Sequence, residues 1–268
     1  MRIGRWTAAL LVAANTGVIV ALWWDGARDV DGAAEVLATL GRLTGLLGAF
    51  VALLALLLIG LGRLADRHAL LGRACLGLLL AHAVLITAGY TSGDGVSLWT
   101  ELGRLVSGYP GVITAIAGLA LLVVVAVTSA RAARRRLRYE TWYFIHLYSY
   151  LGVALAFSHQ IAVGTAFVGR PVARAYWIAL YVATLGALVA LRVLVPVARS
   201  AYHGLRVARV VEAGPDVTSI EVGGRHLGRL RARSGQFFTW RFLTRDHWWE
   251  AHPFSLSAAP DGRRLRIT

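Results

Sequence analysis

The segment His68-Ala-Leu-Leu-Gly-Arg-Ala-Cys-Leu-Gly-Leu-Leu-Leu-Ala-His82 places two histidines 14 residues apart in an apolar stretch. The surrounding sequence is long enough to cross the hydrocarbon core of a bilayer, which needs about 20 apolar residues of helix. An ionisable side chain at membrane depth is energetically costly and marks a candidate functional site. The segment therefore predicts a membrane helix that carries two candidate site residues.

A second apolar segment carries His146 and His159, 13 residues apart. At 1.5 Å per residue, the two histidine pairs are separated by about 21 Å and about 20 Å along their helices. Helices that run in the same direction can therefore set His68 against His146 at one depth and His82 against His159 at another. At about 100° per residue, the 13-residue spacing leaves an angular mismatch of about 140°. The second helix must then be tilted or distorted, and Gly152 offers a position for a distortion.

The composition indicates a membrane protein, because the chain is 57% hydrophobic and only 16% charged despite a net charge of +14. The cations are all arginines clustered between apolar runs, which is typical of bilayer edges and argues against a nucleic-acid binder. The lone Cys75 excludes a disulfide scaffold and a cysteine-ligated metal cluster. Six spans are expected, at residues 6–24, 41–62, 68–90, 109–130, 142–163 and 173–196. The first is longer than the usual core of a secretory signal, the alternative for that stretch.

The arginines also predict orientation, because cytoplasmic loops are enriched in them. Arginines gather before the first span, between the second and third spans, and in the run 131–138, whereas the loop 25–35 is acidic. This bias predicts a multi-pass protein of a bacterial-type inner or plasma membrane, with lipid around it and both termini in the cytoplasm.

After about residue 200, short apolar runs alternate with turn signals such as Gly-Pro, Gly-Gly and Pro-Asp-Gly. The expected fold class is therefore an all-α polytopic membrane bundle at residues 1–200, followed by a partial antiparallel β-barrel at residues 201–268. The barrel is expected to be incomplete, because few residues remain for it.

Two facing imidazole pairs suit two bis-histidine haems, since haem iron accepts axial histidines. Two such haems, one above the other, would carry electrons across the bilayer. Other interpretations are histidines that serve only helix packing, or a channel or transporter that uses them as a proton path.

A second candidate site lies in the β-region, where Ser234–Leu243 is followed by His252-Pro-Phe-Ser255. An isoalloxazine ring needs a flat partner and a hydrogen-bond donor. Phe254 can stack and Ser255 can donate, while Pro253 would leave the strand edge open to a ligand. An ordinary barrel strand with a core phenylalanine is the alternative.

The histidine spacings, together with Asp66-Arg67-His68, resemble the transmembrane domain of the ferric reductase/NADPH oxidase superfamily. The resemblance implies an inner haem b on His68 and His146 and an outer haem b on His82 and His159. The segment His252–Ser255 resembles that family's FAD-binding strand, in a barrel of the ferredoxin-reductase type.

The implied function is a flavocytochrome b oxidoreductase that passes electrons from NAD(P)H through FAD and the haems to an extracytoplasmic acceptor such as ferric iron or oxygen. No G-x-G-x-x-G follows a strand, so a nicotinamide-binding domain would have to come from elsewhere. A haem subunit fed by quinol or a separate redox partner, without its own flavin, is the rival function.

Further arginines are candidates for haem propionates, which need cations near each membrane face. Arg42 is expected near the outer haem, and Arg63, Arg67 and Arg73 near the inner one. The run 131–138 is expected to contact the flavin domain or lipid headgroups. Superoxide-producing relatives resemble one another in a histidine at the position of Ile86, which disfavours the oxidase reaction here.

Overall fold

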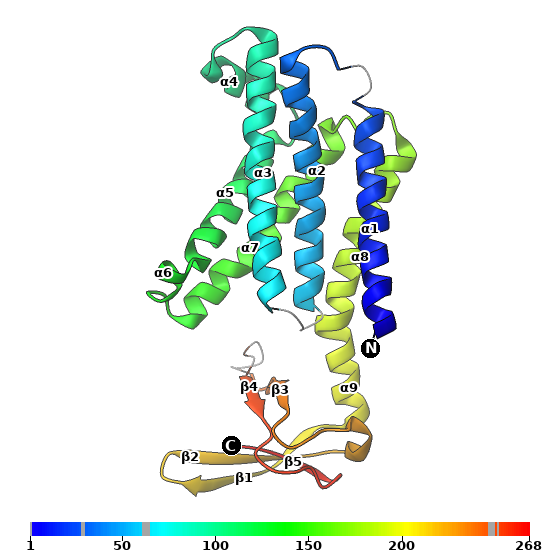
Figure 1. The fold of residues 1–268 in the computed structure, drawn as a ribbon. Helices are drawn as coiled ribbons and strands as arrows, with labels where there is room; N and C mark the ends of the chain where they lie inside the picture. Colours follow the sequence, from blue (N-terminus) through cyan, green and yellow to red (C-terminus); the bar gives the residue numbers. More distant parts are fainter. Residues whose placement is uncertain (1, 28–29, 61–64, 246–249, 251) are drawn as a thin grey trace. The chain divides into compact units, whose positions relative to one another are not determined.

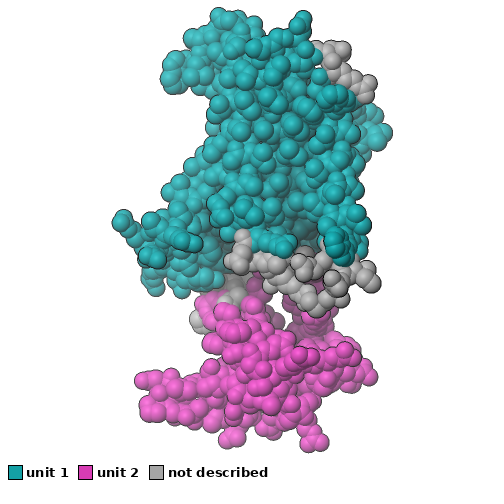
Figure 2. Space-filling view, in the orientation of Figure 1, with its two compact units in different colours: residues 1–188 teal, residues 189–268 magenta. Residues whose placement is uncertain are grey.

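The computed structural model describes residues 2–27, 30–60, 65–245, 250 and 252–268. Two compact units divide the chain, residues 1–188 and residues 189–268, coloured separately in Figure 2. Arg28, Asp29, Arg63 and His247 lie outside the described residues.

The first unit is helical. Its helices are α1 (Arg2–Asp25), α2 (Ala33–Gly60), α3 (Ala65–Asp94), α4 (Leu98–Gly108), α5 (Val112–Ser129), α6 (Arg131–Arg134), α7 (Tyr139–Val163) and α8 (Pro171–Val189). They form the bundle shown in Figure 1.

Five helices among the described residues are long and apolar enough to cross a membrane: Trp6–Asp25, Ala33–Ile59, Arg67–Asp94, Val112–Ser129 and Pro171–His203. The chain is a multi-pass membrane protein, and five of the six expected spans are confirmed. The remaining one, residues 142–163, is helical within α7 but does not reach the same hydropathy. Its sequence includes several tyrosines, two histidines, two serines and a glutamine, so the polar side chains of the candidate site lower its apolar character.

Helices α2 and α3 pack closely because α2 presents small residues to its neighbour. A Cβ placed on Gly41, Gly45 or Gly48 would lie 2.6–2.9 Å from Ile86, His82 or Leu79 of α3. In the other direction, a Cβ on Gly89 of α3 would lie 2.8 Å from the backbone of α2. Small residues of this kind let membrane helices approach backbone to backbone.

Helices α5 and α7 form a second close pair, which runs obliquely to α2 and α3 (Figure 1). A Cβ on Gly118 would lie 2.5 Å from the Gly152 carbonyl oxygen, and a Cβ on Gly152 would lie 3.0 Å from the Gly118 carbonyl oxygen. Gly152 therefore serves helix packing, and α7 is α-helical throughout its length. The oblique course of α7, rather than a distortion at Gly152, accompanies the 13-residue histidine spacing.

Helices α1 and α8 are joined to the rest by a core around Ile19, Phe50, Phe167 and Trp177. The Tyr176 hydroxyl of α8 donates to Asn15 Oδ1 of α1 at 2.8 Å. This bond satisfies two polar groups that would be costly to leave unpaired in lipid.

The second unit contains the end of the last long helix and the strands. A π-helical turn (Ala190–Leu194) and α9 (Val195–His203) precede β1 (Arg206–Gly214), β2 (Val217–Gly223), a 3-10 turn (Leu227–Leu230), β3 (Phe237–Trp240), β4 (His252–Ser255) and β5 (Arg264–Ile267). The strands form a three-stranded sheet in the order β1-β2-β5 and a separate pair, β3-β4, all antiparallel. Val222, Leu227, Leu256, Leu265 and Ile267 form their core. The antiparallel strands are confirmed, but over the described residues they do not close into a barrel.

The glycine contact between α5 and α7 can be tested by substitution. Gly118→Ala should lower the stability of the protein in detergent by about 1–3 kcal/mol, because the methyl group meets backbone that cannot turn aside. Gly77→Ala in α3 is the matched control, since a Cβ there lies within 4 Å of no atom in the described part of the chain. Thermal unfolding should show Gly118→Ala melting earlier, with Gly77→Ala at or above the wild type; equal melting of the two variants would contradict this packing.

Candidate functional site

The four membrane histidines meet in two pairs between α3 and α7. The ring centres of His68 and His146 are 5.9 Å apart, and those of His82 and His159 are 6.2 Å apart. Each pair takes one residue from each helix, in the combination expected from the spacings.

The two α3 histidines are held by backbone carbonyls of α2. Nδ1 of His68 lies 3.1 Å from the Ala55 oxygen, and Nδ1 of His82 lies 2.8 Å from the Gly41 oxygen. Ala55 and Gly41 are 14 residues apart, the same spacing as the two histidines. The antiparallel register of α2 and α3 therefore serves both imidazoles at once.

Gly45 makes room for the His82 ring. A Cβ at this position would lie 2.6 Å from His82 Nδ1, so any larger residue would push the ring away from the Gly41 carbonyl. This close approach explains why position 45, one turn after Gly41, is a glycine.

The two α7 histidines have different surroundings. Nδ1 of His146 lies 3.3 Å from Oγ of Ser129, the last residue of α5. Nδ1 of His159 is buried and has no hydrogen-bond partner among the residues that the structure describes. The His159 backbone is approached by Gly111, where a Cβ would lie 2.8 Å from the His159 nitrogen.

A carbonyl accepts only from a protonated nitrogen, so Nδ1 of His68 and His82 carries the proton. Nε2 of each ring is then unprotonated, and its lone pair can bind a metal ion. Metal-binding histidines usually donate their other N–H to a carbonyl or a similar acceptor. The surroundings of both α3 histidines therefore suit ligation through Nε2.

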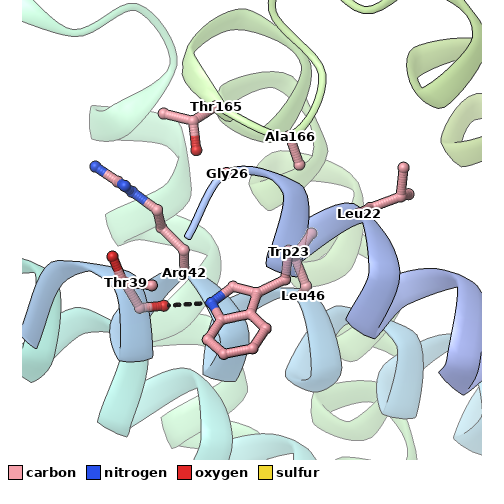
Figure 3. A pocket seen from close by; sticks show the side chains of 8 residues that line it. All are labelled: Leu22, Trp23, Gly26, Thr39, Arg42, Leu46, Thr165 and Ala166. Carbon is pink, nitrogen blue, oxygen red and sulfur yellow. Dashed lines mark hydrogen bonds between the residues drawn. The ribbon is translucent and has the colours of Figure 1, made fainter. Parts of the chain in front are cut away.

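Arg42 lies immediately after Gly41 and is half-buried. It lines a small cavity of about 10 Å³ with Trp23, Thr39 and Thr165, shown in Figure 3. The Trp23 indole donates to the Thr39 carbonyl at 2.8 Å and so joins α1 to α2 beside this cavity. The structure thus places a cation one residue from the carbonyl that holds His82. Arg67 and Arg73, expected near the other pair, are exposed.

A polar cluster lies near the Gly111 loop that approaches His159. Tyr90 and Tyr109 stack with ring centres 6.2 Å apart. Burial, followed by the nearby Tyr90, Glu101 and Asp94, raises the pKa of Tyr109 above its ordinary value.

The candidate flavin strand is β4, which pairs with β3. Phe254 faces Phe238 in the register, and Pro253 faces Thr239. The rings of His252 and Phe254 lie nearly parallel, 6.1 Å apart with 11° between their planes. Phe254 is 39% exposed, so it is not the core residue of an ordinary barrel strand. Ser255 is half-buried.

Sequence reasoning missed the residues that support the imidazoles, chiefly Gly41, Gly45 and Ser129. A signal existed for the glycines, because Gly41-x3-Gly45 in a membrane span is typical of a close helix contact. Ser129 carried no comparable signal, since its role depends on how the end of α5 meets α7.

Gln160, next to His159, was also missed. Its Oε1 accepts from the Trp177 indole at 2.8 Å and from the Tyr181 hydroxyl at 3.1 Å, and its Nε2 donates to the Ala156 carbonyl at 3.0 Å. Since Trp177 is 0% exposed, this network joins α7 to α8 where water cannot replace a lost partner.

Gln160→Met should lower stability in detergent by about 1–3 kcal/mol, because it leaves the Trp177 N–H and the Tyr181 O–H without their acceptor. Adding Tyr181→Phe to this variant should recover part of the loss, since it removes one unpaired donor. Thermal unfolding of the single and double variants measures both effects. A single variant that melts with the wild type would show that the network contributes nothing.

Comparison with protein families gives a match to part of the chain. Residues 40–157 match the family of the ferric reductase like transmembrane component. This range contains His68, His82 and His146 and ends two residues before His159. No curated protein matches the chain. The matched family indicates transmembrane electron transfer by an oxidoreductase. This segment of the chain is therefore similar to the transmembrane domain of the ferric reductase/NADPH oxidase superfamily.

Proposed function

We propose that the protein carries electrons across the membrane through two haem b groups, one held by His68 and His146 and the other by His82 and His159. The observation that carries the proposal is the meeting of four membrane histidines in two pairs, each with one residue from α3 and one from α7.

The ring separations support this function. An imidazole nitrogen binds a first-row metal ion at about 2 Å and its ring centre lies about 1 Å further back, so two imidazoles on opposite sides of one metal have centres about 6 Å apart. Both measured separations, 5.9 Å and 6.2 Å, agree with this value.

The number of protein ligands supports haem over a bare metal ion. Among the described residues, no group of three or more His, Cys, Asp or Glu side chains could hold a metal. A metal ion bound by only two imidazoles needs its remaining ligands from elsewhere, and a porphyrin supplies them in its plane. Haem iron with two axial histidines exchanges single electrons and has no open position for a substrate.

Arg42 is the proposed partner of the propionates of the outer haem. It is half-buried and adjoins the carbonyl that holds His82. A guanidinium in such a place can form paired, charge-assisted hydrogen bonds with a carboxylate.

FAD is the proposed cytoplasmic electron source, at His252, Pro253, Phe254 and Ser255. The parallel, partly exposed rings of His252 and Phe254 offer a flat surface for an isoalloxazine ring, and the Ser255 hydroxyl can donate a hydrogen bond. NAD(P)H would reduce the flavin only with a nicotinamide site that a further domain or partner supplies.

The direction of transfer follows from the arginine bias, with both termini in the cytoplasm. Electrons would enter at the His68 pair, pass to the His82 pair and leave to an extracytoplasmic acceptor such as ferric iron or oxygen. In the rival function, electrons come from quinol or a separate redox partner and the chain holds haem without flavin.

Replacing His82 by Ala should lower the haem content of the purified protein from about two per chain to about one, because only the His82–His159 pair loses an axial ligand. His159→Ala should give the same value. A pyridine haemochrome assay against protein concentration measures the ratio. His226→Ala, at an exposed position of the second unit, is the control and should keep both haems. Loss of both haems or of neither would contradict the pairing.

Phe254→Ala should lower the flavin content, because it removes the exposed ring of the proposed stacking surface. Flavin fluorescence after denaturation of the purified protein measures this content. Phe237→Ala is the matched control, since Phe237 is 71% exposed on the neighbouring strand. Haem without flavin in the wild-type protein would favour the rival function.

A further inference from the structure

The pair of His68 and His146 is supported on the α7 side by Ser129, Trp142 and Arg134, which lie where α5 ends and α7 begins. We infer that these three residues are positioning residues for the inner haem: Ser129 and Trp142 hold the His146 ring, and Arg134 adds a positive charge over the Trp142 ring. This inference rests on the proposed function.

Ser129 connects His146 to Trp142 by hydrogen bonding. Its Oγ lies 3.3 Å from His146 Nδ1 and accepts from the Trp142 indole N–H at 3.2 Å. If Nε2 of His146 binds metal, Nδ1 carries the proton and donates to the same oxygen. One hydroxyl then fixes the tautomer of the imidazole and the position of the indole.

Trp142 restrains the face of the imidazole. It lies one helical turn before His146, and the two rings stack with centres 5.1 Å apart and 30° between their planes. The hydrogen bond on the ring edge and the indole on the ring face together restrict rotation of His146 about its side-chain bonds.

Arg134 completes the support. Its guanidinium carbon lies 4.5 Å from the centre of the Trp142 ring and 5.6 Å from that of Tyr139. A cation above an aromatic face is held by the ring quadrupole. The other arginines of the run 131–138 are exposed, so Arg134 is distinguished from them by its aromatic contacts.

Two opposite effects on the reduction potential follow. A nearby cation disfavours the ferric state, which carries one more positive charge than the ferrous state, and so raises the potential. A hydrogen bond accepted from Nδ1–H makes the imidazole a stronger donor to the metal. This stabilises ferric iron and lowers the potential. Arg134 and Ser129 should therefore shift the same haem in opposite directions.

The test is an absorbance-monitored redox titration of the full chain purified in detergent. Arg134→Gln should move the midpoint of one haem to a more negative potential and leave the other haem in place. Arg135→Gln removes the same charge from an exposed neighbour and should give a smaller shift. Arg134→Lys should lie closer to the wild type than Arg134→Gln, because it keeps the charge.

Ser129→Ala should move the same haem to a more positive potential, or release that haem alone. Trp142→Phe keeps a stacking ring but loses the N–H, and it serves as a second variant should Ser129→Ala fail to fold. Repeating the titrations in the His82→Ala background shows whether the affected haem is the inner one.

The inference is overturned if Arg134→Gln behaves like Arg135→Gln, if both haems shift equally, or if Ser129→Ala and Trp142→Phe leave both midpoints unchanged. Wild-type protein without haem would instead contradict the proposed function itself, and this inference with it.

Discussion

The hydrogen bond between His82 Nδ1 and the Gly41 carbonyl determines how the candidate site is built. It places the imidazole proton on Nδ1, where it is donated to α2, and leaves Nε2 free to bind a metal. The bond can form only because Gly45 has no side chain beside the ring. The same register of α2 and α3 brings His68 Nδ1 to the Ala55 carbonyl, so one helix contact orients two candidate ligands about 21 Å apart.

The polar groups of the bundle are satisfied by neighbouring helices, as a lipid environment requires. Gln160 binds Trp177 and Tyr181 of α8, Tyr176 binds Asn15 of α1, and Trp23 binds the Thr39 carbonyl. Helix α7 carries Gln160 together with His146, His159, two serines and several tyrosines, which lowers its hydropathy relative to the five apolar helices. The polar residues that form the candidate site on α7 are therefore also the reason for its lower hydropathy.

The helical bundle, five of its spans and the meeting of the histidines could be predicted from the sequence. Apolar length determines the spans, and spacing along a helix determines depth, so both are encoded locally. The support of the imidazoles could not be predicted, because it depends on which helices become neighbours: Ser129 reaches His146 only where α5 and α7 cross. The distortion considered at Gly152 is not found, because α7 is α-helical from Tyr139 to Val163. A glycine in a helix can permit either a bend or a close contact, and here it permits the contact with Gly118.

The β-region shows a different limit of prediction. Turn signals between short apolar runs located the strands, and the register of β3 and β4 places Phe254 opposite Phe238. The apolar runs do not predict which strands pair, however. The described strands form a sheet of three and a sheet of two rather than one barrel.

The two histidine pairs also differ in the angle between their rings, 66° for His68 and His146 and 39° for His82 and His159. The relative orientation of axial imidazole planes controls how the d orbitals of low-spin ferric iron split. With iron between the rings, the first pair would give a more axial electron paramagnetic resonance signal and the second a more rhombic one. Two centres with the same pair of ligands would then be magnetically distinct.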